Sequence, residues 1–252
     1  MILFTNGDSW TQGDSPAQEI NWEATKTEEW YDIIPNFGKL YNSNPKAGTK
    51  ILYKFYDSPV WPKELGKRLG VETWNAGRLG DSNYDIKIST IQGIEWLKAQ
   101  GKKNIFAIIG WTSQIRIPIY TVNAEGETEV VQQRPDVVKS ANNLYEKDNF
   151  IQNEFLHNIL DIQNYFKVNN IDYLMFNAFD PFKDFNTHYM SKFIDRTKWI
   201  NHTITPAHFK EYIFQKYDLK NWDVSPYFIT AHPRDISHKA WAKYLYNYIQ
   251  SL

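Results

Sequence analysis

Hydrophobic and polar residues divide this chain into two kinds of segment that alternate along its length. Short continuous apolar runs, typical of strands buried on both faces of a parallel sheet, are separated by longer segments with apolar residues at helical spacing. The predicted strands cover residues 2–5, 70–74, 104–109, 171–177 and 227–230. The predicted helices cover residues 61–69, 86–100, 140–168, 208–217 and 236–248. This alternation predicts a three-layer α/β fold, a doubly wound parallel sheet with helices on both faces.

Three long segments stand outside this alternation. Residues 12–60 are aromatic and rich in turn residues, residues 118–138 are polar and predict an exposed hairpin or flap, and residues 180–205 are again aromatic. Loops of this length in a compact domain are usually functional or disordered. We expect them to shape substrate specificity. Because the chain has neither an internal repeat nor a linker, residues 1–252 are predicted to form one domain.

The end of the first predicted strand carries the first candidate for chemistry. Gly7 and Asp8 are turn residues that suit an abrupt exit from a strand, and Ser9 follows them directly. In open α/β sheets ligands bind at the carboxyl ends of the strands, where this serine would lie. A serine hydroxyl is a weak nucleophile until a base takes its proton, so a base is needed nearby.

Gly7-Asp8-Ser9 resembles the first block of the GDSL/SGNH hydrolases, a superfamily of serine esterases and acetylhydrolases. Three further stretches follow in the family's order: Asn75 to Gly80, Gly110-Trp111-Thr112-Ser113, and His232-Pro233. The resemblance implies a flavodoxin-like strand order of 2-1-3-4-5, with Ser9 as nucleophile and His232 as general base. Gly-Trp-Thr-Ser followed by Arg116 is also similar to a variant in phage-borne members of the superfamily.

The resemblance also implies an oxyanion hole. Gly80 stands where the family has its oxyanion-hole glycine, and a glycine lets a backbone N–H approach the reacting carbonyl closely. Thr112 stands where the family has an asparagine, and a threonine hydroxyl can still donate a hydrogen bond. The expected donors are therefore the N–H groups of Ser9 and Gly80, with Thr112 as a third. Alternatively, Ser113 or a water molecule is the third donor, or the oxyanion hole is weak. The glycines of the second block, taken alone, also fit a simple strand-to-helix turn without chemistry.

The group that orients the base is left open by the sequence. The family's aspartate, three residues before the histidine, is replaced here by Ile229. Asp235 one helical turn further on, Asp223 upstream, or a backbone carbonyl could take its place, although Asp235 equally fits a carboxylate that complements the helix dipole. A rival register makes His238 the base through Asp235-x-x-His238, but it loses the match to His-Pro, in which Pro233 is predicted as the first helical residue.

Two tryptophans flank the proposed blocks. Trp10 follows the nucleophile and Trp111 lies in the third block. Aromatic faces often line sugar sites, which makes both residues candidates for binding a carbohydrate ester; the alternative is that they only pack the loops. No histidine spacing marks a metal site, and we expect neither a metal nor another cofactor.

Composition excludes several classes of protein. A net charge of −1 gives no electrostatic argument for a nucleic-acid partner, and the absence of cysteine excludes disulfides and thiolate nucleophiles. No apolar run approaches the roughly 20 residues of a membrane span, and the first residues have no signal-peptide pattern. These features predict synthesis in a cytoplasm, and they are compatible with association with a virion.

The functional expectation is a serine esterase that hydrolyses short acyl esters, of the O-acetyl type, on a small molecule or a polysaccharide. The alternative is a non-catalytic carbohydrate-binding or virion structural protein with the same fold. Thr112 and Ile229, which depart from the family pattern, favour that alternative.

Overall fold

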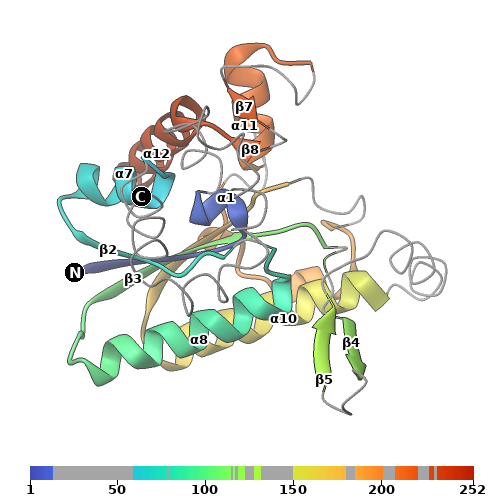
Figure 1. Ribbon diagram of the computed structural model, residues 1–252. Coiled ribbons are helices and arrows are strands. Elements are labelled where there is room, and N and C mark those ends of the chain that lie inside the picture. Colours follow the sequence, from blue (N-terminus) through green and yellow to red (C-terminus); the bar gives the residue numbers. More distant parts are fainter. Residues whose placement is uncertain are drawn as a thin grey trace, which may run out of the picture.

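The centre of the protein is a four-stranded, all-parallel sheet with strand order β2-β1-β3-β6 (Figure 1). The computed structural model describes the chain apart from residues 14–58, 79, 115, 117–118, 123–127, 132–149, 180–184, 201–207, 221–226 and 230–231. The strands are β1 (Ile2–Asn6), β2 (Glu72–Asn75), β3 (Ile105–Trp111) and β6 (Asp172–Asn177). In the register of the sheet, Phe4 of β1 pairs with Trp74 of β2 and with Ala107 of β3. The carboxyl ends of the strands therefore meet at one edge.

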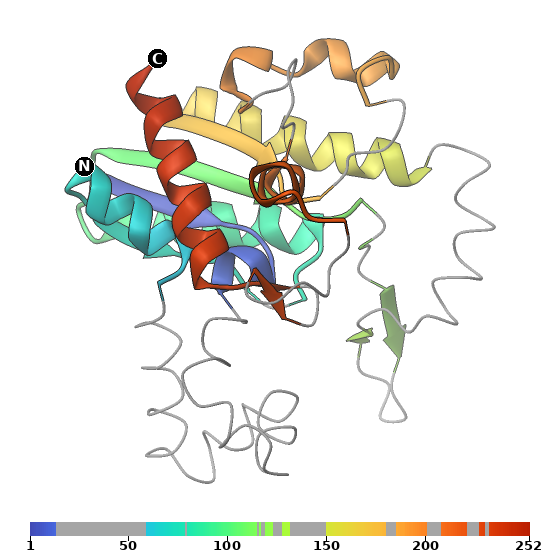
Figure 2. The same cartoon turned by 90° about the horizontal axis from the view of Figure 1, so that it is seen from above.

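Helices cover both faces of this sheet (Figure 1, Figure 2). They are α7 (Trp61–Leu69), α8 (Asn83–Ala99), α10 (Phe150–Val168), α11 (Phe209–Tyr217) and α12 (Asp235–Gln250). Successive residues of a strand point to opposite faces. Phe4 accordingly packs into the core with α8 and α10, whereas Leu3 packs into a second core with α7, α11 and α12. The predicted three-layer, flavodoxin-like α/β fold is confirmed.

Local signals in the sequence set the ends of these helices. α7 has its predicted bounds, because Gly70 adopts a left-handed conformation (φ 67°) just after its last residue. α8 begins three residues before its predicted start, at a capping box in which Ser82 and Asp85 each accept a backbone N–H of the other. α12 begins at Asp235 with Arg234 as its N-cap, so the prediction that Pro233 starts the helix is wrong.

The predicted fifth strand does not join the sheet. The strand β7 (Phe228–Ile229) lies in this segment and pairs antiparallel with β8 (His232–Pro233) in a separate hairpin. The segment instead forms the hairpin that carries His232.

The far edge of β6 is covered in a different way. Trp199 bridges Met175 and His208 bridges Asn177, both in the parallel sense. The N–H of Ile200 adds a hydrogen bond of 2.9 Å to the carbonyl of Met175. Two separate pieces of chain thus take the place where a fifth strand was expected.

The long segments are described in part. Residues 118–138 contain β4 (Ile119–Val122) and β5 (Thr128–Val131), which pair antiparallel, so the hairpin is confirmed. The segment 180–205 contains two short 3₁₀ helices, η2 (Tyr189–Phe193) and η3 (Arg196–Lys198). Most of the segment 12–60 lies outside the described residues. Among the helices that the structure describes, none is long and apolar enough to span a bilayer.

Candidate active site

Ser9 lies at the carboxyl edge of the sheet, where β1 runs into a single helical turn, α1 (Ser9–Gln12). Asp8 is the N-cap of this turn, and its Oδ1 accepts the N–H of Trp10 at 3.0 Å. The carbonyl of Asp8 also accepts the N–H groups of Thr11 and Gln12 at 2.9 Å. These bonds hold the Ser9 backbone firmly, and the serine is almost fully buried.

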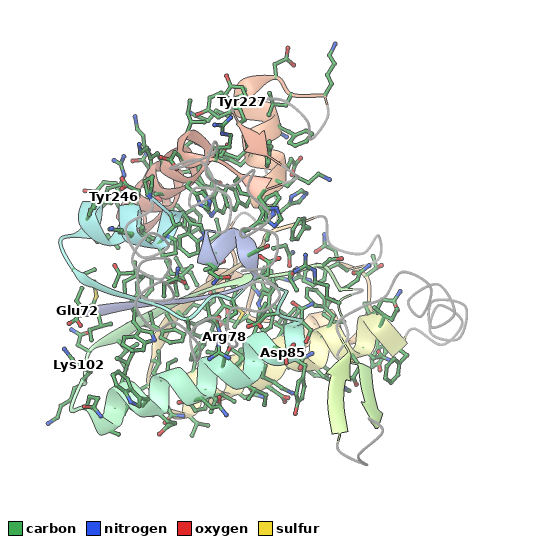
Figure 3. The ribbon with its side chains drawn as sticks, viewed as in Figure 1. Glu72, Arg78, Asp85, Lys102, Tyr227 and Tyr246 are labelled. Atoms are coloured by element: carbon green, nitrogen blue, oxygen red, sulfur yellow. The ribbon has the colours of Figure 1, made fainter. Side chains whose placement is uncertain are left out.

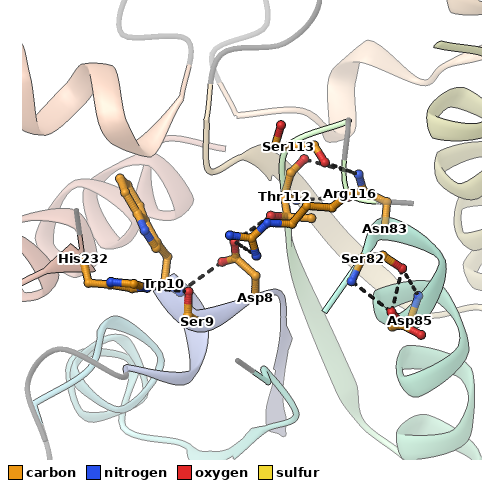
Figure 4. Close-up of polar contacts among 10 residues, drawn as sticks. All are labelled: Asp8, Ser9, Trp10, Ser82, Asn83, Asp85, Thr112, Ser113, Arg116 and His232. Atoms are coloured by element: carbon orange, nitrogen blue, oxygen red, sulfur yellow. Dashed lines mark hydrogen bonds and ion pairs between the residues drawn. The ribbon is translucent and has the colours of Figure 1, made fainter. Parts of the chain in front are cut away.

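His232 reaches Ser9 from the other end of the chain. Its Nε2 lies 3.0 Å from Ser9 Oγ, although the two residues are 223 positions apart (Figure 4). This distance lies within the range expected for a nucleophile and its general base. With the proton on Nδ1, the Nε2 lone pair can accept the hydroxyl proton. The structure therefore brings together the two residues that the sequence proposed as nucleophile and base.

His238, the base of the rival register, lies elsewhere. It is fully buried in α12, where its Nδ1 accepts the backbone N–H of Trp61 at 3.2 Å. Burial, together with the nearby charge of His232, lowers the pKa of His238 to about 3, against a weaker opposing effect of the Pro233 carbonyl. His238 is thus a neutral core histidine at pH 7, and of the two it is His232 that contacts Ser9.

Asp8 has a second set of partners through its other oxygen. Oδ2 accepts the hydroxyl of Thr112 at 2.6 Å and a guanidinium N–H of Arg116, with Nη1 at 3.2 Å (Figure 4). The carboxylate itself is completely buried, so these charged and neutral donors compensate its desolvation. Asp8 thereby links the first block to the third.

This arrangement bears directly on the expected third oxyanion donor. The hydroxyl proton of Thr112 is used by Asp8, and the backbone N–H of Thr112 donates to Asn83 Oδ1 at 3.0 Å. Neither donor of Thr112 is available to a substrate in this geometry, which counts against the expectation that Thr112 completes the oxyanion hole.

Asn83 is a contributor that sequence reasoning missed. Besides accepting the Thr112 N–H, its Nδ2 donates to the carbonyls of Thr112 (3.4 Å) and Ser113 (3.1 Å). The side chain is buried and fixes the third block against the first turn of α8. Its position next to the N-cap Ser82 was the only signal, and it did not point toward the third block.

The second block lies directly against the nucleophile turn. Asn75 Nδ2 donates to the carbonyl of Thr11 at 2.9 Å, and the N–H of Arg78 donates to the carbonyl of Gly7 at 3.1 Å. A Cβ on Gly77 would lie 2.9 Å from the backbone nitrogen of Gln12, so only glycine permits this approach.

Gly80 lies in the turn between β2 and α8 with φ of 82°, a left-handed conformation that favours glycine. Its place in the chain, two residues before the N-cap Ser82, matches the block order. Its role as an oxyanion donor with Ser9 stays a prediction.

Asp81, next to Gly80, is electrostatically unusual. Burial raises the pKa of its carboxyl to about 7, and the neighbouring Asp85 adds to this, whereas Arg78 opposes it. Asp8 and Arg116 also contribute, with opposite signs. Figure 3 shows Arg78 and Asp85 on the side of the sheet that α8 covers. The exposed ion pair between Lys102 and Glu72 lies at the amino-terminal end of the parallel strands, at the other end of the sheet from Asp8 and Ser9.

The hairpin that carries His232 is tied to α12. Tyr227 accepts hydrogen bonds at its carbonyl from the N–H of Arg234 (2.8 Å) and from Ser237 Oγ (2.9 Å). Asp235 is the first residue of α12, three positions after His232. Asp223, the upstream candidate, lies outside the described residues. Which group orients the imidazole stays open between Asp235, Asp223 and a backbone carbonyl.

Both candidate sugar-binding tryptophans are buried. Trp10 packs against Phe179 and Phe209, with ring centroids 4.5 Å and 5.2 Å away, and Trp111 packs edge-on against Phe155 at 6.3 Å. Their exposed fractions are 1% and 0%. These contacts favour the packing interpretation over a sugar-stacking role for both residues.

The described part of the chain contains no group of three or more His, Cys, Asp or Glu residues that could hold a metal ion. No protein-family model matches the sequence, and no curated protein matches it either.

Proposed function

We propose that this chain is a serine ester hydrolase of the GDSL/SGNH type that cleaves short acyl esters through an acyl-enzyme. The observation that carries the proposal is the 3.0 Å contact between Ser9 Oγ and His232 Nε2 at the carboxyl edge of a parallel sheet. The order of the blocks along the chain and the packing of the second block on α1 support the same interpretation.

In this proposal His232 Nε2 takes the proton of Ser9 as Oγ attacks the ester carbonyl. The C–O bond to the alcohol then breaks while His232 returns the proton to the leaving oxygen. A water molecule, deprotonated by His232, attacks the acyl-enzyme, and Ser9 regains its proton when the acid leaves. The N–H groups of Ser9 and Gly80 are the proposed oxyanion donors.

The substrate class is proposed as O-acetyl esters, on a small molecule or a polysaccharide. This part of the proposal rests on the resemblance to acetylhydrolases, since the tryptophans that suggested a sugar site lie in the core.

A hydrolysis assay with paired variants tests the function. Acetate release from p-nitrophenyl acetate and from acetylated oligosaccharides would be measured for the wild type, Ser9→Ala and His232→Ala. Ser251→Ala and His157→Ala serve as matched controls, because both residues are exposed, His157 on α10 and Ser251 just after the last residue of α12. Both site variants should lose at least about a thousandfold in kcat, and the controls should not. Full activity in Ser9→Ala would show that the proposal is wrong.

The second candidate is a binding or virion structural protein that retains the hydrolase fold without its activity. The observation that favours it is the commitment of both Thr112 donors to Asp8 and Asn83, because the loss of one oxyanion donor costs about 10²–10³ in rate. In that case the folded wild type would bind acetylated glycans without releasing acetate.

A further inference from the structure

The proposed esterase site needs a donor that Thr112 does not supply, and Arg116 is placed to provide one. A guanidinium carries five N–H donors. The contact to Asp8 uses Nη1, and within the described residues the other guanidinium nitrogens have no hydrogen-bond acceptor. The side chain of Arg116 is 27% exposed, although the Asp8 carboxylate that it contacts is completely buried.

Asp8 fixes the guanidinium beside the nucleophile. One carboxylate oxygen of Asp8 accepts Arg116, and the other accepts the N–H of Trp10, the residue that follows Ser9. In Figure 4 the Asp8 carboxylate lies between Arg116 and the turn that carries Ser9. A single carboxyl group therefore separates the positive charge from the backbone of the nucleophile turn.

An aromatic contact holds the guanidinium from a second direction. Arg116 Cζ lies 6.0 Å from the ring centroid of Phe179, and that ring packs against Trp10 at 4.5 Å. Cation–π contact and ion pair together restrict the rotamers of a long side chain. Such restriction is what a preorganised oxyanion donor requires, because a donor already in place needs no rearrangement during the reaction.

We propose that Arg116 is the charged oxyanion donor of this site, in the role expected of Thr112. As Ser9 Oγ bonds to the carbonyl carbon, the C=O π pair moves onto oxygen, and an N–H of Arg116 donates to that oxygen without giving up its proton. Asp8 positions Arg116 and balances its charge in the resting site. This inference rests on the proposed function.

The test compares arginine variants with two controls, using p-nitrophenyl acetate kinetics, the rate at which Ser9 is labelled by a fluorophosphonate, and Tm. Arg116→Ala should lower kcat and the labelling rate by about 10²–10³, with a smaller change in KM, and added guanidinium should restore part of the rate. Arg116→Lys, which keeps the charge, should lose less. If Arg116→Ala does not fold, Arg116→Gln replaces it. Because glutamine keeps an amide donor, this variant should also lose kcat and labelling rate, but by a smaller factor.

The controls separate catalysis from stability. Thr112→Val removes the 2.6 Å bond to the same Asp8 oxygen, so it should lower Tm but change kcat less than about tenfold. Arg68→Ala removes the positive charge of an exposed arginine on α7, outside the proposed blocks, and neither guanidine rescue nor a kcat loss should follow.

The outcomes are distinct. Wild-type hydrolysis and labelling that Arg116→Ala or Arg116→Gln leaves unchanged would overturn the arginine assignment alone. The same would follow if Thr112→Val and the arginine variants lost kcat in proportion to their loss of Tm, because Arg116 would then act only through Asp8. A folded wild type that shows neither hydrolysis nor Ser9 labelling would overturn the proposed function and this inference together.

Discussion

Replacing Asp81 by asparagine should stabilise the protein in mildly alkaline solution and leave its stability almost unchanged in acid. Burial, with help from Asp85, raises the pKa of the Asp81 carboxyl from 3.8 to about 7. Below about pH 4 this carboxyl is protonated in both the folded and the unfolded chain. Between about pH 4 and pH 7 only the unfolded chain releases the proton, so the stability of the wild type falls as the pH rises, and above pH 7 the penalty is complete.

The magnitude follows from the separation between the two pKa values. A separation of about three, at about 1.4 kcal/mol for each pKa unit, sets a ceiling of about 4 kcal/mol on the penalty. The Asp81 side chain is only partly buried, and solvent screening reduces this to roughly 1–2 kcal/mol. For a domain of this size that corresponds to a Tm difference of about 2–8 °C.

Thermal unfolding by circular dichroism, from about pH 4 to pH 8, measures this effect. The difference in Tm between Asp81→Asn and the wild type should be near zero at pH 4 and positive at pH 8. Asp172→Asn is the control, because Asp172 is 87% exposed and should show no such divergence. Equal Tm differences at both pH values, or a variant less stable than the wild type at pH 8, would refute the reasoning.

Three further predictions concern the supports of the site. Gly77→Ala should lower Tm and slow Ser9 labelling, because its Cβ would lie 2.9 Å from a backbone nitrogen of α1; unchanged labelling kinetics would contradict the close packing. Asn83→Ala should cost about 1–3 kcal/mol in urea unfolding, since it leaves buried backbone groups of the third block without partners. His238→Phe should cost a similar amount, about 1–3 kcal/mol, because the Trp61 N–H loses its acceptor. Burial lowers the pKa of His238 from 6.5 to about 3, so between these pH values the unfolded wild-type chain takes up a proton at this residue and the folded one does not. The wild-type fold therefore loses stability as the pH falls from 6.5, and the phenylalanine variant should lack this acid-dependent contribution to Tm.

Much of the fold follows from local patterns in the sequence. The apolar runs that became β1 and β3 are buried on both faces, which is what a continuous apolar strand predicts. The bounds of α7 could be predicted correctly because Gly70 ends it. In contrast, α8 starts earlier than its apolar spacing predicts, because Ser82 and Asp85 form a capping box at its start. The pairing at the far edge of β6 could not be predicted, because Trp199 and His208 each form a single isolated bridge. One paired residue produces no alternating hydrophobic pattern in the sequence.

The site divides in the same way. Ser9 and His232 could be proposed because each stands in a recognisable block, and the structure places them in contact. The bonds from Thr112 and Arg116 to Asp8 join residues more than a hundred positions apart, and no local pattern encodes them. The burial of Trp10 could not be predicted either. An aromatic residue next to a nucleophile has the same local sequence whether its side chain lines a cleft or, as here, packs in the core.

The central claim is that Ser9 is a nucleophile activated by His232. The most direct measurement is labelling of the folded protein with a serine-directed fluorophosphonate, with the adduct located by mass spectrometry in the wild type, Ser9→Ala and His232→Ala. An adduct on Ser9 in the wild type that disappears in both variants is the predicted result. A wild type that is folded by circular dichroism and forms no adduct, or forms one on another serine, would contradict the claim and favour a binding or structural role.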